Sequence, residues 1–232
     1  LFKYSLSKVD MVFTNNIFNH RFINRYFTYK KSVFTFDYPV FSEKIIENRI
    51  ETIKNKKKDL IKIIVISSMR PVKNPEGTAQ FINLICKYRN DVEFILIGNN
   101  QKECLIDFLD KQALKNIFFT GVKSKEETNN ILSSVNYLLS LSFSEGTPNS
   151  VIEAMSLGIP CILSNISPHQ YLSDKQSNYF ISLTNLKNDT ISISKKLSSI
   201  DSIGLRSINV RKCISNLSKR YLNLIDAIDI NE

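Results

Sequence analysis

One stretch of the chain, residues 142–160, contains the residue types that could do chemistry: S-F-S-E-G-T-P-N-S-V-I-E-A-M-S-L-G-I-P. Its two carboxylates, Glu145 and Glu153, are eight positions apart, the first in an expected loop and the second in an expected helix. The N-terminus of such a helix presents free backbone N–H groups, which bind anions. The stretch therefore predicts an anion-binding loop flanked by two carboxylates.

Local signals bound the expected helix within this stretch. Thr147 is a good N-cap residue with Pro148 at the first helical position, and Gly158 and Pro160 are typical stop signals. Short apolar runs lie on both sides of the stretch. The unit is therefore predicted to be strand, loop, helix and strand.

A second loop, S-S-M-R-P-V-K-N-P-E-G, adds two cations. Arg70 and Lys73 follow an apolar run, with Asn74 as the expected N-cap and Pro75 as the first residue of the next helix. Arg offers a planar fork to phosphate oxygens and Lys a point charge, so the pair beside a helix N-terminus suits a diphosphate. A surface pair of Arg and Lys is otherwise ordinarily solvated, so this interpretation depends on the stretch 142–160.

The elements that must position these loops follow a regular pattern. From Leu60 onward, continuous apolar runs alternate with amphipathic segments, as a parallel sheet covered on both faces requires. The predicted fold class is α/β, a doubly wound parallel sheet of Rossmann-like type, in which ligands bind beyond the carboxyl ends of the strands. Strands are expected at 61–66, 92–97, 117–120, 137–141, 160–163 and 179–183, and helices near 75–89, 100–114, 125–134, 148–157 and 167–173.

The stretch 142–160 resembles the signature of family 4 glycosyltransferases, E-G-x-P-N-x-x-x-E-A-M-x-x-G-x-P. These are retaining enzymes of the GT-B architecture that use nucleotide-diphosphate sugars, and the signature lies on their nucleotide-binding C-terminal domain. The resemblance implies a nucleotide-diphosphate sugar as donor substrate and no tightly bound cofactor. The matching residues are Glu145, Gly146, Pro148, Asn149, Glu153, Ala154, Met155, Gly158 and Pro160.

The resemblance also implies roles for individual residues. Arg70 and Lys73 would hold the donor diphosphate and stabilise the leaving nucleotide, while Glu145 and the backbone of 146–149 would hold hydroxyls of the donor sugar. Glu153 would accept hydrogen bonds from the ribose hydroxyls. The expected catalytic residues are Glu145, Arg70 and Lys73, and the expected donor-binding residues are Glu153, Gly146, Thr147, Pro148, Asn149, Ser150, Val151, Gly98, Gly121 and Val122.

Each of these residues has an ordinary alternative. Glu153 could be a solvated helix position and Glu145 a loop carboxylate near a helix start. Gly98 and Gly121 directly follow expected strands, where glycine permits close approach of a ligand, but simple turn glycines are equally favoured. The resemblance implies that the backbone around Val122 meets the nucleotide base. His169 is interpreted as an ordinary loop histidine rather than a catalyst.

The resemblance predicts four segments along the chain. Residues 1–43, with strands at 9–14 and 32–36 and a helix at 17–27, resemble the end of the N-terminal, acceptor-side domain, whose bulk is missing from this sequence. We expect a charged linker at 44–59, the nucleotide-sugar-binding domain at 60–205, and a C-terminal helix at 206–232. In the family this last helix crosses back to the N-terminal domain, and packing on its own domain is about equally favoured.

Composition narrows the class of protein and its partners. No run approaches 18 uninterrupted apolar residues, and four widely spaced cysteines favour reduced thiols in a cytoplasmic protein. Two histidines provide no cluster of metal ligands. Residues 1–60 hold 12 Lys and Arg against 6 Asp and Glu. The basic run at 54–58 interleaves no aromatic residues, so no nucleic-acid partner is predicted, whereas peripheral contact with the inner face of a membrane stays open.

The predicted function is transfer of a sugar from a nucleotide-diphosphate donor to a hydroxyl of a glycan or lipid-linked acceptor, with retention, in surface polysaccharide or glycan synthesis. One alternative is a non-catalytic nucleotide-sugar-binding module, either a truncated enzyme or a partner-dependent subunit. A sugar epimerase or phosphorylase on the same architecture is another. Paired carboxylates also suggest a glycoside hydrolase, but nothing else in the sequence resembles those enzymes.

Overall fold

The computed structural model divides the chain into two compact units, Leu1–Pro39 and Val40–Glu232. In the first unit β1 (Val12–Thr14) and β2 (Val33–Thr35) pair as parallel strands where the sequence predicts strands. The structure describes residues 60–172 and 178–198, these two strands, and Arg25, Ile45, Glu47 and Arg49. The helices predicted at 17–27 and 206–232 lie outside the described residues, except for Arg25, which is helical.

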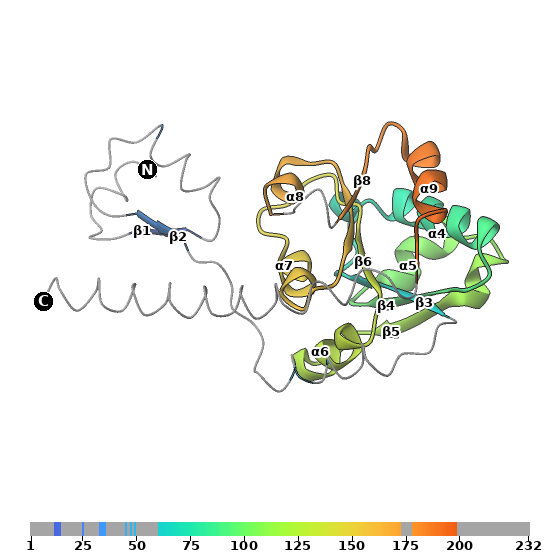
Figure 1. Cartoon of the computed structure of the whole chain (residues 1–232), viewed down its shortest axis with the longest axis horizontal. Helices are drawn as coiled ribbons and strands as arrows, with labels where there is room; N and C mark the ends of the chain where they lie inside the picture. Colours follow the sequence, from blue (N-terminus) through green and yellow to red (C-terminus); the bar gives the residue numbers. More distant parts are fainter. Residues whose placement is uncertain are drawn as a thin grey trace, which may run out of the picture. The chain divides into compact units, whose positions relative to one another are not determined.

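Six parallel strands form the sheet of the second unit, in the order β5-β4-β3-β6-β7-β8 (Figure 1). This is the strand order of doubly wound nucleotide-binding sheets, and the order reverses between β3 and β6. The predicted α/β fold is therefore confirmed. The strands are β3 (Ile61–Ile66), β4 (Val92–Ile97), β5 (Ile117–Gly121), β6 (Tyr137–Ser140), β7 (Cys161–Ser164) and β8 (Tyr179–Ile181).

Helices cover both faces of this sheet, which explains why the central strands are apolar on both sides. Alternate residues of β3 separate into two cores: Ile63 and Val65 belong to one, and Ile64 belongs to the other. The first core includes residues of α4 (Pro75–Tyr88), α5 (Gln101–Leu105) and α9 (Leu186–Ser194). The second includes residues of α6 (Lys125–Ser133) and α7 (Asn149–Ser156).

The single helix predicted at 100–114 is wrong. The structure has the short α5 and then two 3₁₀ turns, Ile106–Phe108 and Ala113–Asn116. The side chain of Asn83 on α4 explains the break, because it donates to Phe108 O (2.8 Å) and accepts from Asp110 N (2.9 Å). These backbone groups are thereby satisfied outside a helix.

Helix α9 has no counterpart among the predicted elements. Its sequence, L-K-N-D-T-I-S-I-S, is rich in residues with weak helix propensity. Leu186, Thr190 and Ile193 are buried against the rest of the domain, and Asp189 accepts a hydrogen bond from Ser182 N (2.8 Å). Tertiary packing therefore decides this helix.

Arg49 is a buried cation in the segment predicted to be a linker. Its side chain is within the second unit, and its Nη1 donates to the carbonyl oxygens of Ser133 (2.6 Å) and Val135 (2.9 Å) at the end of α6. Burial lowers the pKa of the guanidinium to about 10. Because its two hydrogen bonds are to carbonyl oxygens that lack helical partners, the guanidinium caps the C-terminus of α6.

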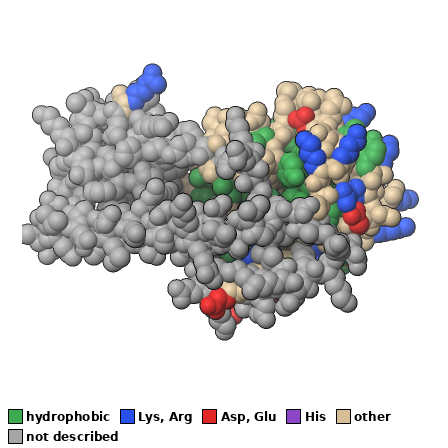
Figure 2. All heavy atoms as spheres, in the orientation of Figure 1, with side chains coloured by type: hydrophobic (Ala, Val, Ile, Leu, Met, Phe, Trp, Pro, Cys, Tyr) green, Lys and Arg blue, Asp and Glu red, His purple; other side chains and the backbone are tan. Residues whose placement is uncertain are grey.

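The surface shown in Figure 2 carries Lys and Arg side chains together with Asp and Glu and with neutral groups. Such a mixture is typical of a solvated face. None of the helices in the described part of the chain is both long and apolar enough to cross a membrane.

Candidate active site

A cleft lies between the loops that follow β3 and β6, at the point where the strand order reverses. Ligands of doubly wound sheets bind at this position. Among the predicted site residues, the cleft brings together Lys73, Glu145 and Ser150, which come from different loops and a helix N-terminus. Its other polar lining residues include Ser67 and Ser142.

An ion pair joins the two loops inside the cleft. Lys73 Nζ is 2.6 Å from Glu145 Oε1 and 2.8 Å from Glu145 Oε2. The side chains are 21% and 8% exposed, respectively. A cation and a carboxylate that are shielded to this degree interact more strongly than a pair on the open surface. The lysine predicted to bind phosphate and the glutamate predicted to bind sugar are therefore direct neighbours.

Ser142 also holds the Glu145 carboxylate. Its hydroxyl donates to Glu145 Oε1 (2.6 Å), and its carbonyl oxygen accepts from the hydroxyl of Ser164 at the end of β7 (2.6 Å). Both serines are buried. The carboxylate thus has a fixed orientation before any ligand binds, and Oε2 keeps lone-pair capacity for a further donor.

Two hydrogen bonds fasten the β3 loop to the β6 loop. Phe143 N donates to Val72 O (2.9 Å), and Asn74 Nδ2 donates to Leu141 O (3.1 Å). Asn74 also caps α4, as the sequence predicts, because its Oδ1 accepts from Gly77 N (3.0 Å). These contacts fix the segment that carries Lys73.

Arg70 lies in the same loop but is exposed. Its backbone immediately precedes the 3₁₀ turn Pro71–Lys73, and its guanidinium has no hydrogen bond or ion pair with the residues that the structure describes. Arg70 is not among the residues that line the cleft, and the structure leaves this cation without a side-chain partner among the described residues.

Helix α7 begins one residue later than predicted. The sequence favours Thr147 as N-cap and Pro148 as the first helical residue, but α7 starts at Asn149 and Pro148 has a non-helical ψ of 76°. Asn149 N donates to Thr147 O (2.9 Å), which makes an inverse γ-turn centred on the proline. The predicted stop is confirmed, because α7 ends at Ser156 and Gly158 adopts a positive φ of 66°.

The backbone N–H groups of the first turn of α7 differ in availability. Val151 N donates to Pro148 O (3.0 Å) and Ile152 N to the same oxygen (3.1 Å). Ser150 N, in contrast, has no acceptor among the residues that the structure describes. Because Ser150 also lines the cleft, this N–H is the best placed of the three for an anion.

Glu153 lies outside the group of side chains that line the cleft. It forms an ion pair with Lys125, the first residue of α6, and its side chain is 15% exposed. Most of this side chain is therefore shielded from solvent, and a role for Glu153 in donor binding stays a prediction.

The glycines after β4 and β5 differ from each other. Gly98 has a φ of 134°, and a side-chain carbon there would lie 1.9 Å from Ser67 O, so the group that approaches it closely is the neighbouring loop. Gly121 has a φ of 70° and open space around it. Val122, which follows, is 73% exposed. A role in donor binding for these three residues stays a prediction.

The sequence model of the family described as Glycosyl transferases group 1 matches residues 46–191, which include the whole cleft. The chain belongs to this family. Its six-stranded Rossmann-like sheet and its signature residues agree with the resemblance to family 4 glycosyltransferases of GT-B architecture, which is thereby confirmed.

The relatives of this chain are distant in sequence. A UDP-Gal:α-D-GlcNAc-diphosphoundecaprenol α-1,3-galactosyltransferase of Escherichia coli is 24% identical over 184 residues, which are 77% of this chain and 46% of the relative. The chain thus spans about half the length of that enzyme. Anabaena HepE in complex with UDP and glucose has 12% identity and a TM-score of 0.69, with 95% of this chain and 63% of that one covered. An S. aureus TarM mutant in complex with UDP and α-GlcNAc-glycerol has 20% identity and a TM-score of 0.69, with 96% and 46% covered.

Two residues that contact the predicted site glutamates have no clear signal in the sequence. Ser142 is a short polar residue among many, and only the folded loop shows that it donates to Glu145. Lys125 is 28 positions from Glu153 and reads as one more exposed lysine at a helix start. No group of three His, Cys, Asp or Glu residues that could hold a metal ion occurs within the described segments.

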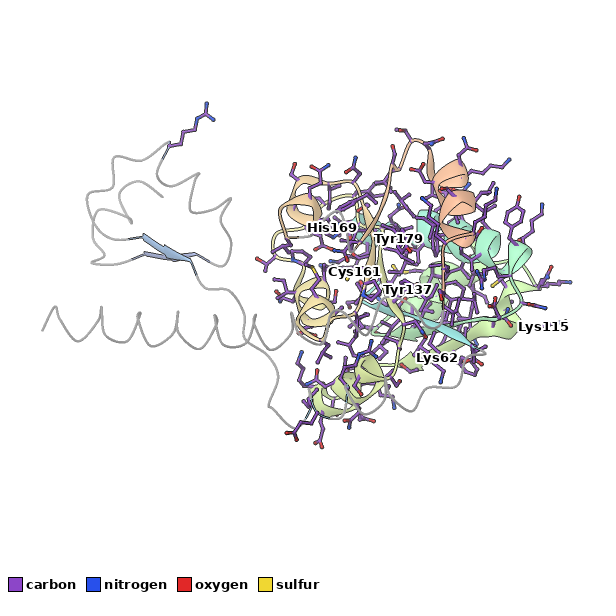
Figure 3. All side chains as sticks on the ribbon, in the orientation of Figure 1. Lys62, Lys115, Tyr137, Cys161, His169 and Tyr179 are labelled. Atoms are coloured by element: carbon purple, nitrogen blue, oxygen red, sulfur yellow. The ribbon has the colours of Figure 1, made fainter. Side chains whose placement is uncertain are left out.

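His169 is not the loop histidine that the sequence suggests. It lies in α8 (Ser167–Leu172) and is fully buried (labelled in Figure 3), and its Nδ1 is 3.0 Å from Ser164 O and 3.2 Å from Ser164 Oγ at the end of β7. The predicted helix near 167–173 is confirmed. His169 therefore supports the serine that holds Ser142.

Burial lowers the pKa of His169, with a smaller opposing effect from its hydrogen bond to Ser164. The unfolded chain then binds a proton more readily than the folded one, so the free energy of unfolding should fall as the pH drops below about 6.5. Each unit by which the pKa is lowered corresponds to about 1.4 kcal/mol at acidic pH.

Urea unfolding of wild type and His169→Gln at pH 7.5, 6.5 and 5.5 measures this effect. We expect the difference in stability between the two proteins to shrink or change sign towards pH 5.5. Only the wild type has an imidazole that is protonated more readily in the unfolded chain than in the folded one. A difference that is the same at all three pH values would contradict the prediction.

Proposed function

We propose that this chain binds a nucleotide-diphosphate sugar in the cleft between the β3 and β6 loops and takes part in transfer of the sugar to an acceptor hydroxyl with retention. The observation that carries the proposal is the Lys73–Glu145 pair, which lines the same cleft as Ser150. A diphosphate needs cations and N–H donors, and a sugar needs a fixed hydrogen-bond acceptor. The cleft supplies both kinds of group.

In this proposal the residues have separate roles. Arg70, Lys73 and the N-terminus of α7 bind the diphosphate and stabilise its charge as the bond to the anomeric carbon breaks. Glu145, oriented by Ser142, accepts hydrogen bonds from the donor sugar and faces the positive charge that develops on the ring. The acceptor hydroxyl attacks from the side of the departing diphosphate, which retains the configuration.

The wider setting is part of the same proposal. The acceptor would be a glycan or lipid-linked sugar, as in surface polysaccharide synthesis, and it would be bound with the help of an N-terminal domain. Of the three relatives, one is a galactosyltransferase that uses UDP-Gal and two have structures in complex with UDP, which supports UDP as the first nucleotide to test. Free thiols at Cys86, Cys104 and Cys161 support a reducing, cytoplasmic location.

Isothermal calorimetry of the 232-residue chain with UDP, GDP and ADP tests donor binding. We expect one nucleotide to bind, and Lys73→Met to weaken its binding about tenfold through the loss of a charge-assisted hydrogen bond. Lys87→Met is the matched control, because Lys87 is exposed in the last turn of α4, at the far end of that helix from the cleft. Failure of all three nucleotides to bind would overturn the proposal.

A second function is the alternative to sugar transfer. In this alternative the chain is a nucleotide-sugar-binding module without transfer activity of its own, which needs the same diphosphate-binding groups of the cleft. Binding of UDP without hydrolysis or transfer of a UDP-sugar would support the module. Turnover that needs no added acceptor would instead indicate an epimerase or a phosphorylase.

A further inference from the structure

An ion pair of residues that do not line the cleft joins two helices that follow different strands of the sheet. Lys125 begins α6, which follows β5, and Glu153 lies in α7, which follows β6. Lys125 Nζ pairs with Glu153 Oε1, whereas Glu153 Oε2 accepts no hydrogen bond from the residues that the structure describes. One oxygen of this carboxylate is therefore held and the other is available.

The position of Glu153 relates it to the cleft. Ser150 lines the cleft, and residues three positions apart lie on the same face of a helix, one turn from each other. Glu153 thus lies one helical turn beyond the residue of α7 that lines the cleft. Its side chain is 15% exposed, so a ligand that extends from the cleft along α7 would meet a carboxylate that is already shielded from most of the solvent.

The start of α6 fixes which lysine reaches this carboxylate. Ser124 and Glu127 form a capping box, in which Ser124 Oγ accepts from Glu127 N (3.2 Å) and Glu127 Oε2 accepts from Ser124 N (2.9 Å). Lys123 pairs with Glu127 on the same helix (3.2 Å). Lys125 is the lysine that crosses to α7, from a backbone position that the capping box holds.

We infer that Lys125 is a positioning residue for the ribose of the bound nucleotide: it holds Glu153 Oε1 so that Oε2 faces the ribose hydroxyls. The inference rests on the proposed function. A carboxylate that a cation already orients loses less conformational freedom when it accepts a hydrogen bond from a ligand. Lys125 is 53% exposed, so the pair itself contributes little to stability and the protein should fold without it.

The test compares UDP with 2′-deoxy-UDP in calorimetry on the 232-residue chain. Wild type should bind UDP about tenfold more tightly, the effect of one hydrogen bond to a charged acceptor. Lys125→Met should lower the affinity for UDP but not for 2′-deoxy-UDP, and so reduce this preference to about threefold or less. Lys125→Arg should restore most of it. Lys123→Met, which removes the same charge two positions away, should leave the preference unchanged.

Each outcome separates the inference from the proposed function. If Lys125→Met weakens both nucleotides equally, or changes neither, Lys125 does not act through Glu153 and the inference is overturned. If wild type binds both nucleotides with the same affinity, the ribose contact is wrong while diphosphate binding stands. If wild type binds no UDP, the proposed UDP site and this inference fail together.

Discussion

Replacing Glu145 by alanine is expected to lower sugar transfer by about 100-fold or more in the active enzyme, because preorganised charges at the reacting centre are among the largest contributions to catalysis. Lys73→Ala should have a similar effect. The two side chains form one unit, with Lys73 Nζ within 2.8 Å of both carboxylate oxygens of Glu145. Groups that act as a unit are not additive. The double variant should therefore lose hardly more activity than either single variant.

The measurement is the initial rate of transfer from the nucleotide sugar that the calorimetry selects. Glu126→Ala is the matched control, since Glu126 is an exposed carboxylate in the first turn of α6. Circular dichroism checks the fold of each variant, because Ser142 loses its acceptor when Glu145 is removed. Near-normal turnover of both Glu145→Ala and Lys73→Ala would rule out the assignment of a catalytic pair.

Replacing Gly98 by alanine should lower the free energy of unfolding by about 3 kcal/mol or more, as forced overpacking and unfavourable backbone angles together cost this much. The new carbon would lie 1.9 Å from Ser67 O, and the φ of 134° is one that residues with side chains rarely adopt. Ser67 O also accepts a hydrogen bond from the buried side chain of Gln101 (2.6 Å). The substitution therefore has to displace the loop that carries Lys73.

Gly121→Ala is the control for Gly98→Ala. Gly121 also has a positive φ, of 70°, but open space surrounds the position of a new side chain. Its cost should be only the backbone strain of about 1–2 kcal/mol. Urea denaturation measures both, and calorimetry with nucleotide should show weaker binding for Gly98→Ala at temperatures where it stays folded. Equal stability losses in the two variants would contradict a steric origin.

The comparison between these two glycines illustrates what sequence alone leaves open. Both follow strands and both suggest close approach of another group. Only the structure shows that Ser67 fills the space at Gly98 whereas nothing approaches Gly121. Sequence patterns describe the neighbours of a residue along the chain, and the group that touches it across a sheet edge depends on strand order.

For secondary structure, too, local sequence predicts some elements and contacts distant in sequence decide others. The apolar runs of β3 and β4 predict these strands with their observed bounds, because strands buried on both faces need continuous apolar side chains. The break after α5 and the existence of α9 were missed, because Asn83 and the surface of α4 decide them from elsewhere in the sequence. The start of α7 was misplaced by one residue, because Pro148 forms a γ-turn instead of the first helical position.

The sequence by itself determined the doubly wound sheet, the family resemblance carried by residues 145–160, and the residue types of an anion and sugar site. The order of residues along the chain is enough to predict these features, since they depend on local periodicity and on a contiguous signature. Only the tertiary structure decided that Lys73 pairs with Glu145, that Ser142 and Ser164 hold this carboxylate, and that Lys125 reaches Glu153. These contacts join loops and helices that the strand order, with its reversal between β3 and β6, brings to one edge of the sheet.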